Sequence, residues 1–147
     1  MNQPLQDERI ATSLRIEVQL SSADAWPVQF TMLDSNGEAL PAAVTLRDGE
    51  LENLHDVLAK IAAHAAPAAG GLPFGGPDET RVILGFDDYV TPHFNFYCTF
   101  AYPSAEGGYQ PVTGRALVTD ASLARLVDGL REVKEAGQGV VDWVIAD

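Results

Sequence analysis

The sequence predicts an α+β fold, in which an antiparallel sheet of about six to seven strands carries two amphipathic helices on one face. Three observations predict this fold. Short segments that alternate apolar and polar residues recur along the 147-residue chain, as in half-buried strands. Two longer segments place apolar residues three and four positions apart, as in helices packed on a sheet. The order of three strands and then a helix occurs twice.

The first unit opens with three strands. Residues 14–20 alternate between apolar and polar side chains, and residues 28–32 continue this period of two up to the turn sequence DSNG at 34–37. A third short strand is predicted at 42–46. Residues 1–12 show no such pattern, so we expect them to form a polar tail.

A helix and a connector follow. Asp48 is expected to cap the helix, because its carboxylate can accept hydrogen bonds from the free amide groups of the first turn. Residues 51–65 then place Leu, Ile and Ala at three-and-four spacing, which gives one apolar stripe. The segment 66–77 is rich in Gly, Pro and Ala and is expected to be a flexible connector between the units.

The second unit repeats this order of elements. Its strands are expected at 82–86, 94–100 and 112–118. Asp120 is expected to cap the second helix, whose apolar stripe covers residues 123–133. Residues 140–145, which include a tryptophan, fit a last strand or a terminal segment docked on the core. We expect residues 1–147 to form a single domain.

The net charge narrows the classes of partner. Nine Lys and Arg stand against 21 Asp and Glu, for a formal net charge of −12. A field of this sign repels nucleic-acid backbones and anionic membranes, and it speeds encounter with basic proteins. We therefore expect a basic protein as partner, and neither nucleic acid nor a membrane. The single cysteine, the absence of a secretory signal and the lack of a long apolar run together predict a cytoplasmic location.

Catalytic and metal-binding motifs are missing. No serine stands in a G-x-S-x-G elbow, and no H-E-x-x-H, C-x-x-C or EF-hand spacing occurs. Cys98 alternates with phenylalanines, which is typical of a buried structural cysteine. We therefore expect no catalytic residue, no metal and no cofactor. One alternative stays open, in which Asp87, Asp88 and His93 meet across a hairpin as a weak cation site or in a small enzyme.

Candidate partner-binding residues lie on the segment LGFDDYVTPHFNFYCTF at 84–100 and on the strand that leads into it. If the phenylalanines of this segment point to the helices, the residues that alternate with them point away. An exposed mixture of Tyr, His, Asn and Arg, flanked by two carboxylates near the turn, suits a protein-contact surface. The other interpretation is a solvated polar sheet face without a partner. The candidate residues are Arg81, Asp87, Asp88, Tyr89, His93, Asn95 and Tyr97.

By its general build the chain resembles the small acidic immunity proteins that bacteria make against polymorphic toxins. The shared features are length, acidity and a strand-rich body with two helical segments, DGELENLHDVLAKI and DASLARLVDGLREV. This resemblance implies a non-catalytic inhibitor that covers a toxin's active site or substrate surface, and it transfers no binding residue.

The chain is also similar to type III secretion chaperones, in its acidity and in the order strands, helix, strands, helix. That resemblance implies a homodimer that holds an effector in extended form. Those chaperones usually begin with a helix packed on the sheet, and here only LQDERIATS precedes the first strand. The sequence leaves the oligomeric state open.

Overall fold

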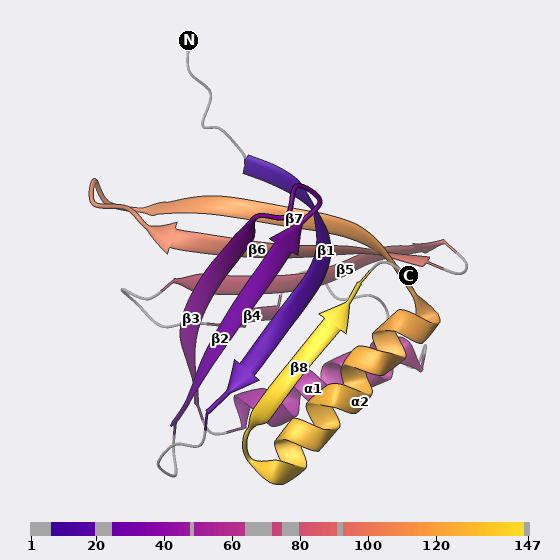
Figure 1. Ribbon diagram of the computed structural model, residues 1–147. Helices are drawn as coiled ribbons and strands as arrows, with labels where there is room; N and C mark the ends of the chain where they lie inside the picture. The colour runs from indigo at the N-terminus through magenta and orange to yellow at the C-terminus, as the bar shows by residue number, and fades with distance from the viewer. Residues whose placement is uncertain are drawn as a thin grey trace.

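The described residues of the chain form eight strands and two helices in a computed structural model (Figure 1). The structure describes residues 7–19, 25–47, 49–63, 72–74, 80–90 and 93–145. In chain order the elements are β1 (Asp7–Val18), β2 (Ala25–Asp34), β3 (Ala39–Arg47), α1 (Glu50–Ala62), β4 (Leu72–Phe74), β5 (Arg81–Val90), β6 (His93–Pro103), β7 (Tyr109–Thr119), α2 (Asp120–Ala136) and β8 (Gly139–Val144). The predicted α+β class is confirmed, and so is the order of two units, each with three long strands followed by a helix.

Strand β1 connects the two halves of the sheet, which are β1, β2, β3 and β8 on one side and β4 to β7 on the other. The strand order is β3-β2-β1-β7-β6-β5-β4, with β8 paired to β1 outside this path. All neighbours are antiparallel except β1 and β7, which run parallel where Asp7–Ile10 faces Val112–Arg115. From Ser13 onward the same side of β1 pairs with β8. We call the point where β1 leaves β7 and meets β8 the fork; an irregularity in the β1–β2 register between Ala11 and Ser13 lies there.

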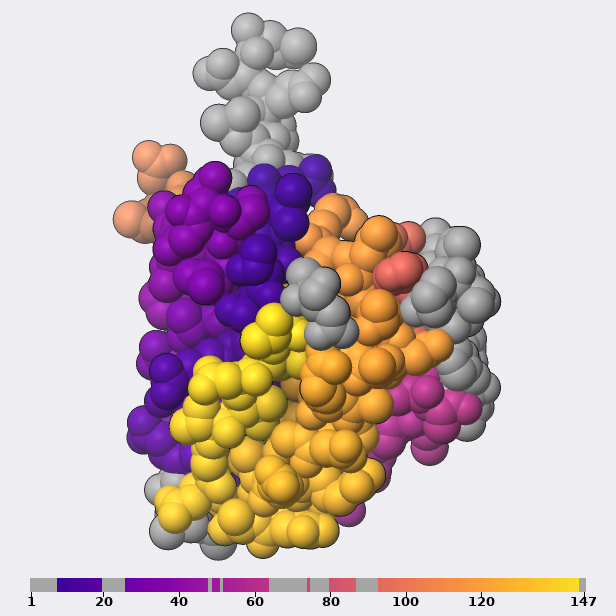
Figure 2. Space-filling view, turned by 45° about the vertical axis from the view of Figure 1, so that its right-hand side comes forward, coloured from indigo at the N-terminus to yellow at the C-terminus, as the bar shows by residue number. Residues whose placement is uncertain are grey.

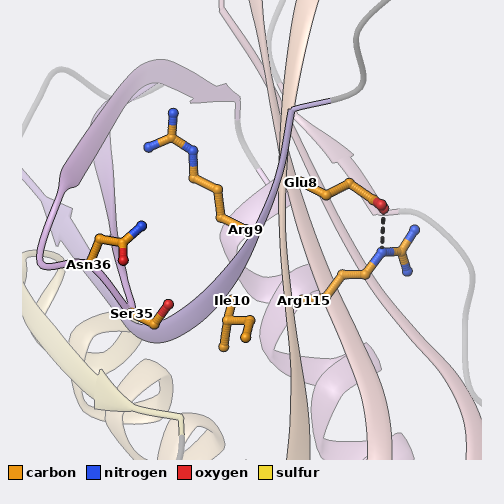
Figure 3. A pocket seen from close by; sticks show the side chains of 6 residues that line it. All are labelled: Glu8, Arg9, Ile10, Ser35, Asn36 and Arg115. Carbon is orange, nitrogen blue, oxygen red and sulfur yellow. Dashed lines mark hydrogen bonds and ion pairs between the residues drawn. The ribbon is translucent and has the colours of Figure 1, made fainter.

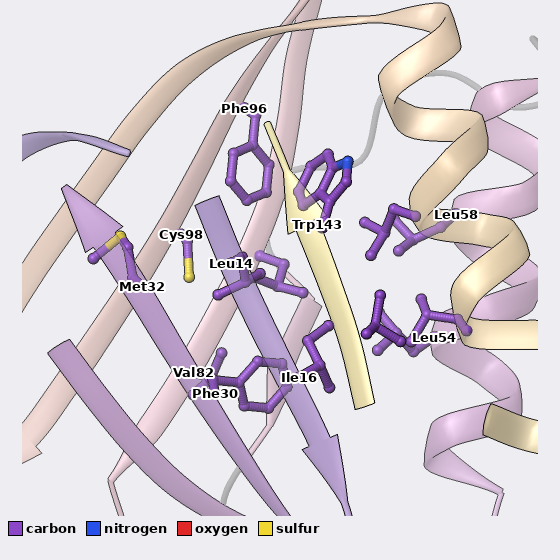
Figure 4. Packing of buried hydrophobic residues seen from close by; sticks show 14 of the residues in the cluster. Leu14, Ile16, Phe30, Met32, Leu54, Leu58, Val82, Phe96, Cys98 and Trp143 are labelled. Atoms are coloured by element: carbon purple, nitrogen blue, oxygen red, sulfur yellow. The ribbon is translucent and has the colours of Figure 1, made fainter. Parts of the chain in front are cut away.

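The core lies between the two halves of the sheet and the helices. In Figure 1, β1, β2, β3 and β8 cross β4 to β7 at a steep angle, and α1 and α2 lie side by side along one side. Figure 4 shows side chains from both halves and from α1 pointing toward one another, among them Leu14, Phe96, Cys98 and Leu58. All four are buried, and burial of each large apolar side chain stabilises the fold by about 1.5–3 kcal/mol.

Strand β1 begins at Asp7, so the expectation of a polar tail through residue 12 is wrong for residues 7–12. Pairing with β2 and β7 recruits this segment, and an ion pair holds it to the β2–β3 turn. The Arg9 guanidinium donates to the buried carboxylate of Asp34 at 3.1 Å and to Glu38. Asp34 also accepts the backbone amides of Asn36 and Glu38 at 2.9 and 2.8 Å, which closes the predicted turn.

The helix stripes are confirmed for the residues that the structure describes, but both helix caps differ from the prediction. The N-cap of α1 is Gly49, whose left-handed backbone carries no side-chain cap; Asp48 lies outside the described residues. The N-cap of α2 is Thr119, whose hydroxyl accepts the amide of Ser122 at 3.1 Å. Thr119 still has extended backbone, whereas Asp120 is already helical. The carboxylate of Asp120 therefore lies in the first turn, where it interacts favourably with the positive end of the helix dipole.

The connector contains a strand. Residues 72–74 pair with β5 as β4, and Phe74 is buried in the core, so the expectation of a flexible connector is wrong for these three residues. The reason is the large apolar side chain of Phe74, which gains more from burial than a glycine can. The rest of the predicted connector lies outside the described residues. Neither α1 nor α2 is long and apolar enough to cross a bilayer, and these are the helices of the described ranges.

The predicted last strand is confirmed as β8, and a buried network ties it to α2. The indole nitrogen of Trp143 donates to the carbonyl oxygen of Ser122 at 2.8 Å and to its hydroxyl oxygen at 3.1 Å. The Ser122 hydroxyl donates in turn to the carbonyl of Ile145 at 3.0 Å. The Trp143 ring meets Phe96 edge to face at 5.2 Å between centroids. These contacts fix β8 against both the helix layer and β6.

Candidate functional site

The candidate site is the side of β5, β6 and β7 that is turned away from the core. Phenylalanines of β5 and β6 and Cys98 point inward and are buried, so the residues that alternate with them point outward. We call this surface the outer sheet face. Its described residues include Arg81, Ile83, Gly85, His93, Asn95, Tyr97, Thr99, Tyr109, Thr113, Arg115 and Leu117.

Tyr97 is held in a fixed position at the centre of this face. Its ring lies over Gly85 on the neighbouring strand, where a methyl group at Gly85 would stand 2.1 Å from the ring Cζ atom. On the other side, the guanidinium carbon of Arg115 lies 5.9 Å from the ring centroid. Arg115 is itself oriented by Glu8, whose carboxylate accepts its Nε–H at 2.7 Å. The site therefore presents an aromatic ring that is ordered before any partner arrives.

A second arginine–tyrosine stack lies further along the same face. The guanidinium carbon of Arg81 on β5 is 5.0 Å from the ring centroid of Tyr109 on β7. Ala101 of β6 stands opposite Arg81 in the register, and its small side chain leaves room for Arg81 to reach across. Between the two stacks, the hydroxyls of Thr99 and Thr113 are 2.9 Å apart and hydrogen-bond to each other. Polar groups on this face thus order one another.

Four of the predicted partner-binding residues lie on the outer sheet face. Asn95 is exposed, while His93 and Tyr97 are half-buried on the same strand. Arg81 shares this face but stands six residues along β5 from Asp87, which is about 20 Å at the usual rise of a strand. Arg81 therefore belongs with Tyr109 and forms no cluster with the residues at the other end of β5.

The remaining predicted residues, Asp87, Asp88 and Tyr89, have side chains outside the described part of the structure. Their backbone belongs to β5, which continues to Val90, so the two carboxylates belong to the last part of the strand, near the turn that follows. The β5–β6 register is regular up to Asp87, which pairs with Asn95, and shifts between Asp87 and Val90. The alternative cation site with His93 stays a prediction.

Sequence reasoning missed the contribution of β7 and β1 to the face. Tyr109, Arg115 and Leu117 point outward from β7, and Glu8 and Ile10 do so from β1. The alternation in β7 could have identified its outward residues, because a buried glycine and a buried valine mark its inward positions. The residues of β1 could not be found in this way, since the fork that places them depends on pairing with distant strands.

Cys98 is confirmed as a buried cysteine. It is fully buried, and its burial raises the pKa of the thiol far above the ordinary value of 9.0. A buried, protonated thiol is a poor nucleophile. Within the described residues, no three His, Cys, Asp or Glu side chains gather as metal ligands would.

His55 is also buried. Its Nδ1 lies 3.1 Å from a carboxylate oxygen of Asp56, and its Nε2 has no hydrogen-bond partner among the described residues. Lys134 approaches the same carboxylate oxygen at 3.9 Å. This cluster couples α1 to α2 and offers no open position for a substrate.

A shallow pocket of about 390 Å³ lies beside the outer sheet face (Figure 3). Its lining residues are Glu8, Arg9, Ile10, Ser35, Asn36 and Arg115. The two arginines are already engaged, Arg9 with Asp34 and Glu38 and Arg115 with Glu8. In Figure 3 their guanidinium groups lie on opposite sides of β1, so they do not converge on one ligand.

The two helices carry more acidic than basic residues, seven against four. Exposed carboxylates on α1 and α2 belong to Glu52, Asp56, Asp128, Glu132 and Glu135. The outer sheet face shows the opposite balance among its described side chains, with Arg81 and Arg115 beside the single carboxylate of Glu8. The described side chains of the outer sheet face therefore carry no excess of negative charge.

Comparison of the chain with protein-family models, with curated proteins and with solved structures found no match. The resemblances to immunity proteins and to secretion chaperones therefore stay predictions. Evidence for a function comes from the outer sheet face and from the distribution of charge around it.

Proposed function

We propose that this chain is a non-catalytic protein-binding protein, most concretely an immunity protein that neutralises a bacterial toxin by occlusion. The observation that carries this proposal is the ordered Tyr97 ring, which Arg115 and Gly85 hold in place on an open sheet face. Tyr and Arg are enriched among the residues that dominate protein–protein binding energy. A ring that is already ordered also loses little conformational entropy when a partner binds.

Charge and contact have separate roles in this proposal. The net charge of −12 attracts a basic toxin from a distance and raises the association rate. The outer sheet face supplies the short-range contacts, which govern the dissociation rate. Raising the salt concentration should therefore slow association while it changes dissociation little.

The test begins with the genes that adjoin the gene for this chain. Each neighbouring product that inhibits bacterial growth is expressed with and without this chain, and growth is scored. The protecting pair is then measured by calorimetry with purified proteins. We expect Tyr97→Ala to weaken binding by roughly 30-fold or more, the loss typical of an interface hot spot, with a melting temperature close to that of the parent.

The matched control is Gln29→Ala, which truncates an exposed side chain on β2, outside the outer sheet face. It should bind as tightly as the parent. Asp88→Lys, at the end of β5, should also weaken binding to a basic partner. Parent-like affinity in Tyr97→Ala would remove the outer sheet face from the interface, and failure to bind any toxic neighbour would count against the immunity role itself.

A further inference from the structure

Apolar side chains gather at the fork. Six large apolar residues are exposed in the described part of the chain, and four of them surround the point where β1 passes from β7 to β8. We call these four the fork patch: Ile10, 64% exposed, Leu117, 60%, Val144, 56%, and Leu33, 38%. Such grouping is informative, because single exposed apolar residues are common whereas clustered ones mark interaction sites.

The sheet register places these side chains side by side. Ile10 pairs with Arg115, so it is the diagonal neighbour of Leu117, about 7–8 Å away on the same face. Ser13 pairs with Leu33 on one side and with Val144 on the other. In Figure 2 the indigo atoms of β1, the yellow atoms of β8 and the orange atoms of β7 and α2 meet near the middle of the view.

The hydroxyl of Ser122 connects the two sides of the fork. It lies 3.3 Å from the carbonyl oxygen of Val144, to which it donates, and Ser122 follows β7 by three residues. Val144 is therefore held near the end of β7, where Leu117 lies. Since β7 and β8 both lie on the same side of β1, the patch continues from one half of the sheet to the other.

We propose that the fork patch is the contact surface of a homodimer of this chain. Two copies that each carry −12 repel each other. At the fork the charged neighbours form two ion pairs, Glu8 with Arg115 and, next to Val144 on β8, Asp142 with Arg15, and neither pair carries a net charge. Around a two-fold axis, Arg115 of one copy can face Glu8 of the other, so the surface is complementary to itself. A basic partner would gain little from an apolar, neutral patch.

The size of the patch sets the expected strength of the dimer. Stable interfaces bury about 800 Å² on each partner, and four side chains with their rim provide less. The dimer is therefore weak and forms at high protein concentration. The dimer is argued from the fork patch and not from Tyr97, so the inference does not depend on the proposed function.

Sedimentation equilibrium of the full chain tests the proposal. Between about 10 μM and about 1 mM, the range expected of a small interface, the average mass should rise from the 15.7 kDa of the monomer toward twice that value. Leu117→Glu should keep the mass at that of the monomer throughout. Val140→Glu is the matched control, because it adds the same charge at an exposed valine of β8, about 13 Å along the strand from Val144, and it should dimerise like the parent.

The dependence of dimerisation on salt concentration is a second, independent test. Raising the salt concentration from about 10 mM to about 150 mM shortens the range of charge repulsion from about 30 Å to about 8 Å, so dimerisation should strengthen. If Leu117→Glu lowers the melting temperature, Val144→Glu replaces it. A parent that stays monomeric at 1 mM overturns the proposal and leaves the patch to another protein. Equal loss of dimer in Val140→Glu overturns it as well, because net charge would then explain the effect.

Discussion

The ring of Tyr97 occupies the space above Gly85, so that a methyl group on Gly85 would come within 2.1 Å of the ring Cζ atom. Strand β5 thus carries a glycine for a packing reason, because the ring needs the space that any larger side chain would fill. Arg115 approaches the ring from the opposite strand. The orientation of the tyrosine at the centre of the candidate site is therefore determined by residues on both neighbouring strands.

We expect Gly85→Ala to displace the Tyr97 ring and to lower the free energy of unfolding by about 1–3 kcal/mol, the usual cost of overpacking. Urea denaturation measures this loss. In a double-mutant cycle, Tyr97→Ala should remove most of the cost of Gly85→Ala, with a coupling energy of about 1 kcal/mol or more. Additive effects of the two substitutions would show that the ring does not depend on the glycine.

Ser122→Ala should lower the free energy of unfolding by about 1–3 kcal/mol, because it leaves the buried carbonyl of Ile145 without its donor. The Trp143 indole keeps the backbone carbonyl of Ser122 as acceptor, so the fold should persist. Urea denaturation followed by tryptophan fluorescence gives the value. Ser35→Ala, at an exposed turn position, is the control and should change stability by less than about 0.5 kcal/mol.

His55→Leu should raise the free energy of unfolding by roughly 1 kcal/mol. The substitution replaces a buried ring nitrogen, which has no partner in the described part of the chain, with an apolar side chain in the helix interface. Thermal and urea denaturation should agree in direction. His93→Leu, at a half-buried position on the outer sheet face, serves for comparison and should be nearly neutral. A clear loss of stability in His55→Leu would indicate that the bond to Asp56 outweighs the unpaired nitrogen.

Stability should fall at alkaline pH because of Cys98. Burial raises the pKa of this thiol in the folded chain, so the unfolded chain loses the proton first, near 9.0. The stabilising difference is complete below this pH and is lost above it, by at most about 1.4 kcal/mol for each pH unit. Burial also raises the pKa of Tyr102, which acts in the same direction at higher pH.

Urea denaturation between about pH 8 and about pH 10.5 measures this slope, since the window brackets the ionisation of a free thiol. Cys98→Ala is the control. It should be less stable than the parent at neutral pH, and its free energy of unfolding should change less with pH. A slope that is the same in both proteins would assign the alkaline loss to other groups.

The strands with strict alternation were predictable from the sequence. In β6 every inward position from Phe94 to Phe100 is apolar, and the pattern alone defined both the strand and its outward residues. The cap of α2 could not be chosen in this way. Thr119 and Asp120 are adjacent and both suit an N-cap, and only the backbone conformation at the end of β7 decides between them.

The candidate site was predicted in part, because its central residue Tyr97 lies on a strongly patterned strand. The supporting residues Arg115 and Glu8 were missed, since they come together across 107 positions of the chain. The start of β1 was missed for the same reason. Its sequence DERI has no alternation, and it becomes a strand through pairing with β7 and through the ion pair of Arg9 with Asp34.

The two-sided pairing of β1 has a consequence for synthesis of the chain. Strand β1 is synthesised well before β7 and β8, so its pairing cannot be complete until those strands have left the ribosome. Until then the β1–β2–β3 meander exposes an apolar face that is later buried against β6 and the helices. Folding that waits for such distant contacts is slow, and the waiting intermediate is prone to aggregate. We therefore expect nascent chains that stop before β8 to depend on general chaperones to stay in solution.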